Sequence, residues 1–136
     1  MKRVVFDSWA LVALLEKEEP AATQVQSLLY QAAANEIECL FSLISLGEIY
    51  YVVGRRHGKS AADETLAELS EAPFTLLAIS QEAVIQAAAF KMVHPISYAG
   101  AFAISVAVQF EATLITGDPE LGRLSHLVDI EFLHRN

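Results

Sequence analysis

The chain has 136 residues, of which 54% are hydrophobic and 19% are charged. That length buries one substantial core and is short for two ordinary domains, so we expect a single domain over residues 1–136. Nine Lys and Arg residues against seventeen Asp and Glu residues give a formal net charge of -8, which argues against binding nucleic acid through a broad basic surface. The single cysteine, Cys39, excludes a disulfide framework and a Cys-rich zinc site, and it favours a reducing cytoplasm.

Two apolar segments bear on targeting. After Met1-Lys2-Arg3 only three apolar residues precede Asp7, which is too short for the apolar region of a signal peptide. The stretch from Met92 to Phe110 has no formal charge, but several polar residues interrupt it. We therefore expect a buried helix there and a soluble, cytoplasmic protein without a membrane span.

The first half of the chain alternates β-branched or aromatic runs with apolar residues at helical spacing. The expected elements are a strand over 3–7, a helix over 9–16 capped by Asp7 or Ser8, a helix from Pro20 to near Asn35, a strand over 37–41 and a helix from Ser45 to His57. Ser45 and Glu48 have the spacing of a capping box, and Gly58 ends that helix. Ser60 and Asp63 repeat the spacing and predict a further helix with an acidic outer face.

The second half continues the alternation. It is expected to contain a strand over 74–79, a helix from Ser80 to Val93, a helix starting at Ser97, a strand over 112–116, a turn at 117–119 and a short edge strand over 128–133. The helix after Ser97 has little polar face, so we expect it to be central. Strands alternating with helices predict a three-layer α/β/α sandwich with a mostly parallel sheet.

Three acids follow or adjoin the predicted strand ends. Asp7 and Asp118 lie at or just past the first and fourth strands, and Glu48 begins the helix after the second. Ligands of parallel sheets bind beyond the carboxyl ends of the strands, so these acids should share one rim. Converging carboxylates repel unless a cation neutralises them, and oxygen donors suit Mg²⁺ or Mn²⁺. Metal-assisted phosphodiester hydrolysis is the chemistry that such a site supports.

Each acid also has a purely structural interpretation. Asp7 is a plausible helix cap, Glu48 fits the third position of a capping box, and Asp118 fits an ordinary turn. Three acids on one predicted rim are harder to explain structurally than any one of them.

Other residues give weaker signals. The four histidines, His57, His94, His126 and His134, lack zinc-ligand spacing, and Cys39 fits a small core residue. The basic cluster Arg55–Lys59 is better explained by favourable charge at a helix C-terminus than by an RNA contact, although the two roles are compatible. No glycine-rich nucleotide-binding motif is present, so a nucleotide-binding regulator is a third and weaker hypothesis.

Three segments together resemble the PIN domain, specifically the VapC-type toxins of toxin–antitoxin operons. They are Val5-Phe6-Asp7-Ser8-Trp9-Ala10-Leu11, Ser45-Leu46-Gly47-Glu48-Ile49-Tyr50-Tyr51 and Leu114-Ile115-Thr116-Gly117-Asp118-Pro119-Glu120-Leu121. The resemblance implies a Mg²⁺- or Mn²⁺-dependent ribonuclease that is active as a homodimer and inhibited by a cognate antitoxin protein. It also implies that Asp7, Glu48 and Asp118 bind the metal, with Ser8 and Thr116 as polar neighbours.

The segment from His94 to Ala103 resembles a further motif of the family with one departure. The family has an aspartate where this chain has Gly100. We therefore expect impaired RNA cleavage, and the main alternative is a PIN fold that binds an antitoxin without cutting RNA. The apolar helices 45–57 and 80–93 predict exposed patches and hence a homodimer.

Overall fold

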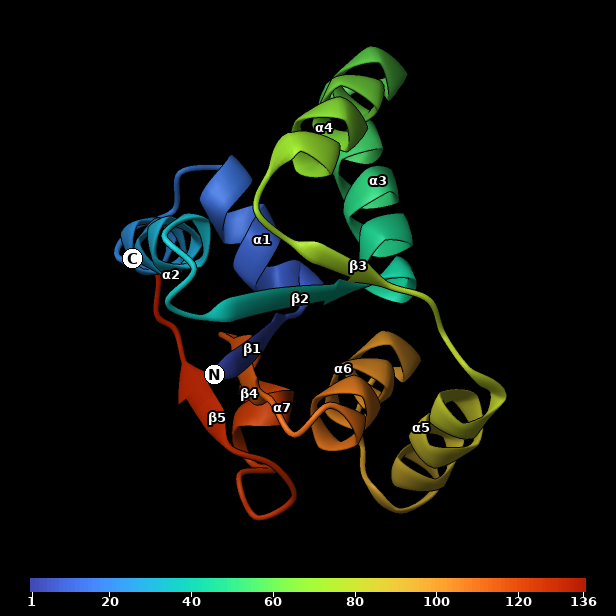
Figure 1. The fold of residues 1–136 in the computed structure, drawn as a ribbon. Helices are drawn as coiled ribbons and strands as arrows, with labels where there is room; N and C mark the ends of the chain where they lie inside the picture. Colours follow the sequence, from blue (N-terminus) through green and yellow to red (C-terminus); the bar gives the residue numbers. More distant parts are fainter.

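Five short parallel strands form one sheet in the computed structural model of the protein, which describes residues 1–136 (Figure 1). The strands are β1 (Arg3–Phe6), β2 (Glu38–Ser42), β3 (Thr75–Leu77), β4 (Thr113–Thr116) and β5 (Ile130–Phe132). Their order across the sheet is β3-β2-β1-β4-β5, so the first strand of the chain is central. It pairs with β2 on one side and β4 on the other, and this brings the ends of β1 and β4 together.

Helices cover both faces of this sheet (Figure 1). They are α1 (Ser8–Leu15), α2 (Ala21–Ala33), α3 (Leu43–His57), α4 (Lys59–Glu71), α5 (Gln81–Val93), α6 (Tyr98–Gln109) and α7 (Pro119–Gly122). Val4 and Phe6 of β1 belong to a core shared with α1 to α4, whereas Val5 belongs to a second core with α5, α6 and α7. Neighbouring strand residues point to opposite faces, so one strand serves both cores. The predicted three-layer α/β/α sandwich is confirmed, and every strand pair is parallel.

Helix α6 is the most enclosed of the helices. Every residue from Gly100 to Ala107 is buried, as its nearly uninterrupted apolar sequence predicted. None of the helices has the length and apolar character needed to cross a membrane.

The start of α3 differs from the prediction. Ser42, the last residue of β2, has extended backbone angles, and its hydroxyl accepts a hydrogen bond from the Ser45 amide at 3.2 Å. The helix therefore begins at Leu43 rather than Ser45. Glu48 lies in the second turn, so the proposed capping box of Ser45 and Glu48 is wrong. The Glu48 carboxylate is consequently free of any capping role.

The predicted caps of α4 are also wrong. Helix α4 begins at Lys59 after Gly58, whose φ of +92° is one that few other residues adopt. Asp63 accepts hydrogen bonds from Tyr50 Oη at 2.6 Å and Lys59 Nζ at 3.0 Å instead of capping the helix. Strand β3 is shorter than predicted, with only 75–77 paired to β2. Its residues are at the sheet edge and Leu76 is 48% exposed.

Candidate active site

A cavity of about 220 Å³ opens beyond the carboxyl ends of β1 and β4. Its charged lining consists of Asp7, Glu48, Asp118, Arg56 and Arg135. Ser97, Ala99 and Gly100 line it from α6 and the residue before that helix. The three acids predicted to share one rim therefore line one cavity, although they come from three distant parts of the sequence.

Asp7 is buried at the junction of β1 and α1. Its Oδ1 accepts a hydrogen bond from the Ala10 amide at 2.9 Å, which makes it the cap of α1. Its Oδ2 accepts a hydrogen bond from the Thr116 hydroxyl, and the Thr116 oxygen in turn accepts one from the Asp118 amide at 3.1 Å. The carboxylate is thus held by donors from both α1 and β4.

Burial raises the pKa of Asp7 to about 7. The hydrogen bonds from Thr116 and the Ala10 amide favour the charged form and oppose that rise. The negative charges of Asp118 and Glu48 add to it. Asp7 therefore experiences both other acids electrostatically, and a cation at this place would stabilise its ionised form.

Glu48 and Asp118 are held by different contacts. Glu48 is half-buried on α3 and accepts a hydrogen bond from the hydroxyl of Ser8, the first residue of α1. Asp118 caps the short helix α7, with Oδ1 accepting from the Glu120 amide at 2.9 Å. The capping interpretation is thus correct for Asp7 and wrong for Glu48, while Asp118, expected in an ordinary turn, caps α7. Capping is compatible with lining the cavity.

Gly100 lies in the first turn of α6, where its amide donates to the Ser97 hydroxyl oxygen at 3.0 Å. A Cβ placed on Gly100 would approach Leu121 Cδ2 and Ser97 Oγ at 3.1 Å each. Both neighbours are side-chain atoms, and a shift of a few tenths of an ångström makes room. A carboxylate at this position would extend the acidic lining to α6, provided that the buried Leu121 side chain and the Ser97 hydroxyl that caps α6 shift.

The carboxylates fit a hydrated hard cation better than a directly coordinated soft one. No group of three or more His, Cys, Asp or Glu side chains is arranged to hold a metal ion. The cavity donors are carboxylate and hydroxyl oxygens, and Mg²⁺ commonly binds through one or two carboxylates while keeping several waters. The chemistry of the donor set matches Mg²⁺ or Mn²⁺ in that mode.

The remaining sequence candidates lie elsewhere, and two lining residues were missed. Cys39 is a buried core residue, and burial raises the pKa of its thiol to about 12. His57 contacts Glu16 through Nε2 at 2.8 Å, outside the cavity lining. Sequence analysis assigned Arg56 to a helix end and gave no role to Arg135, yet both line the cavity. Only the basic cluster pointed to Arg56, and no local signal pointed to Arg135.

Comparison with known proteins identifies the family. The model of the PIN domain matches residues 4–127, most of the chain and all three acids. The chain belongs to the PIN domain family. No curated protein sequence matches this PIN domain.

Solved structures share the fold of this PIN domain. VapBC2 from Rickettsia felis, bound to a promoter DNA fragment, matches with a TM-score of 0.75 at 14% identity, covering 97% of this chain and 99% of that one. VapC20 of Mycobacterium tuberculosis, described as a sarcin–ricin loop cleaving toxin, gives a TM-score of 0.73 at 16% identity, covering 89% and 94%. A toxin–antitoxin complex from Klebsiella pneumoniae gives 0.64 at 21% identity, covering 85% and 86%.

Proposed function

We propose that this PIN domain is the toxin of a type II toxin–antitoxin pair and a Mg²⁺- or Mn²⁺-dependent endoribonuclease. The observation that carries the proposal is the cavity in which Asp7, Glu48 and Asp118 meet beyond the sheet. The fold shared with VapC20, a toxin that cleaves the sarcin–ricin loop, supports RNA as the substrate class. The neighbouring toxin–antitoxin complexes support an antitoxin protein as the partner.

Asp7 and Asp118 would hold the divalent cation, with Glu48 binding it directly or through water. When bound, the cation supplies an activated water and neutralises charge that develops on the phosphodiester. Thr116 orients Asp7 by donating to one of its oxygens, and Ser8 orients Glu48 in the same way. The N-terminus of α1, which Asp7 caps, adds a positive potential that favours the ionised carboxylate.

We expect Gly100 to give this chain a low cleavage rate. The α6 side of the cavity contributes no charged group, so one position for a metal ligand or for orienting water is missing. An added carboxylate that is worth about 3 kcal/mol in the transition state raises the rate on the order of a hundredfold.

The decisive experiment compares Gly100→Asp with Gly100→Asn in RNA cleavage with Mg²⁺. The two variants differ by a charge and not by size, so we expect the gain of about a hundredfold only in Gly100→Asp. EDTA should abolish it. Equal rates in the original chain and in a folded Gly100→Asp variant would contradict the ribonuclease proposal.

A second candidate function is a PIN module that binds an antitoxin without cutting RNA. Two observations favour it: the missing carboxylate at Gly100, and the absence of three side chains arranged to hold a metal directly. The same Gly100→Asp experiment separates the two functions, because a binding module stays inactive after the substitution.

We also propose that the protein forms a homodimer. Helix α5 carries exposed apolar side chains, with Ile85 62%, Met92 81% and Val93 70% exposed. Apolar side chains gathered on one surface commonly mark an interface. Light scattering at tens of micromolar tests this: a dimer that Ile85→Glu dissociates supports the proposal, and a strict monomer contradicts it.

A further inference from the structure

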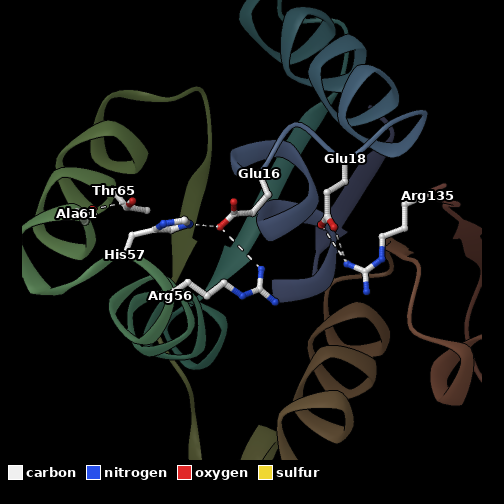
Figure 2. Close-up of polar contacts among 7 residues, drawn as sticks. All are labelled: Glu16, Glu18, Arg56, His57, Ala61, Thr65 and Arg135. Carbon is white, nitrogen blue, oxygen red and sulfur yellow. Dashed lines mark hydrogen bonds and ion pairs between the residues drawn. The ribbon is translucent and has the colours of Figure 1, made fainter.

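Two arginines are the only cations that line the acidic cavity, and they come from distant parts of the sequence. Arg56 belongs to the last turn of α3, and Arg135 follows β5. Both lie beside glutamates at the end of α1 and in the loop that follows (Figure 2). The fold has therefore brought two positive charges to the lining of a cavity whose other charged groups are acids.

Arg135 is held in place by several independent contacts. Its Nη1 donates to both oxygens of Glu18, at 3.0 and 3.2 Å, and its guanidinium lies 4.9 Å from the centre of the Trp9 ring. The backbone of Arg135 also forms a bridge with Pro20. A guanidinium fixed by a carboxylate, an aromatic ring and its own backbone has lost much of its rotational freedom before any ligand arrives.

The Trp9 ring links Arg135 to the acids. It packs directly on Gly117, where a Cβ would come within 2.3 Å of the ring. Gly117 lies between Thr116 and Asp118. The turn on which Trp9 packs therefore also carries the hydrogen bonds that hold the acids. The absence of a side chain at position 117 is what allows this close approach.

Arg56 is held more loosely. Its Nη1 lies 3.8 Å from Oε1 of Glu16, the oxygen that His57 Nε2 also contacts at 2.8 Å (Figure 2). The side chains of Arg56 and Arg135 remain 49% and 42% exposed. A guanidinium has five N–H donors, and the glutamates occupy only Nη1 of Arg135 and none of Arg56 at hydrogen-bonding distance. Donors are thus left for an incoming ligand.

We propose that Arg56 and Arg135 bind the phosphates of single-stranded RNA at the acidic cavity. The inference rests on the proposed function, since it names how this same site accepts its substrate. A chain with a net charge of -8 and three acids in the site repels a polyanion. Arginine is suited to overcome this locally because its planar fork forms paired hydrogen bonds with phosphate.

The test measures binding rather than cleavage, with a short fluorescein-labelled single-stranded RNA in Mg²⁺ and the full chain carrying its own Gly100. We expect Arg56→Gln and Arg135→Gln each to weaken binding about tenfold. The plot of log affinity against log salt should become shallower by about 0.7 for each arginine removed. Arg56→Lys and Arg135→Lys, which keep the charge and lose the fork, should lie between the original chain and the Gln variants.

Arg55→Gln and Arg123→Gln are the matched controls, because both arginines are exposed and neither lines the cavity. Equal losses in control and cavity variants would overturn the proposal, as would an original chain that binds no RNA at any salt concentration. Polyglutamate binding that responds to the same variants would identify a carboxylate site and also overturn it. The cleavage assay of Gly100→Asp is independent of this test. If that variant does not cleave RNA, the nuclease proposal is rejected, but RNA binding by the two arginines is not.

Discussion

The two sides of the cavity are built in opposite ways. On the sheet side, Asp7, Thr116 and the Asp118 amide form a continuous hydrogen-bonded network that joins β1 to β4. On the α6 side, Ser97, Ala99 and Gly100 contribute no charge, and the Ser97 hydroxyl is used to cap its own helix. The first side concentrates negative charge that costs free energy to bury, and the second lacks the group expected there. The contrast teaches that the scaffold can be complete while one chemical group is missing.

The largest expected effect concerns the crowded side and is measured without metal. With its pKa raised to about 7, Asp7 binds its proton more tightly in the folded protein than in the unfolded chain. The stability from this group is fully present below about pH 4 and is lost as the pH rises toward 7, by up to about 4 kcal/mol. Asp7→Asn should abolish this part of the pH dependence.

Urea unfolding of the original chain and Asp7→Asn in EDTA, from pH 4 to 8.5, measures the difference. The variant should gain stability relative to the original chain as the pH rises, because exposed acids are common to both and cancel. A constant difference across that range would show that Asp7 does not titrate with a raised pKa.

The second effect concerns the support of the network. Gly117→Ala forces a Cβ into the Trp9 ring at 2.3 Å, and overpacking of this kind costs about 1 to 3 kcal/mol. Gly47→Ala is the matched control. Gly47 is an exposed helical glycine, and a Cβ added there meets no other atom within 4 Å. The control should gain up to about 1 kcal/mol from helix propensity. Similar unfolding free energies for the two variants would contradict the close packing of Trp9.

The third effect concerns the side that lacks a charge. Gly100→Asp should bind Mn²⁺ about tenfold more tightly than the original chain, because it adds an oxygen donor to the cavity. Its thermal stability without metal should fall modestly, because a fourth carboxylate adds repulsion to the three acids and Leu121 and Ser97 have to shift. Calorimetry measures the affinity. Mn²⁺ binding that is unchanged in the double variant Asp7→Asn, Asp118→Asn would show that the ion binds elsewhere.

The smallest effect concerns the contact between α1 and α3. Ser8→Ala removes one part-buried hydrogen bond to Glu48, which should cost about 1 kcal/mol or less. Glu48 then loses its orienting donor. In the Gly100→Asp chain, the same substitution should therefore raise the activation free energy of RNA cleavage by more than it lowers the free energy of unfolding. Equal stability together with equal cleavage would show that Ser8 has no orienting role.

Sequence predicted the layers and the common location of the acids because both follow from regular patterns. Alternating strands and helices predict a parallel sheet. Asp7 directly follows β1, and Asp118 lies two residues after the end of β4. The start of α3 was missed because the sequence does not show that Ser42 has two roles. With its extended backbone, Ser42 is both the last residue of β2 and the cap of α3. Arg135 was missed because its position depends on packing against Trp9 and Glu18, which are far from it in the sequence.

The pairing of β1 with β4 has a consequence for the protein during its synthesis. Asp7 and the Thr116 hydroxyl that holds it are separated by 109 residues. A nascent chain therefore exposes Asp7 early and cannot anchor it until the fourth strand has left the ribosome. Fragments released before that point contain two of the three acids and lack the partner strand. Assembly of the acidic cavity is thus delayed until nearly the whole chain has been translated.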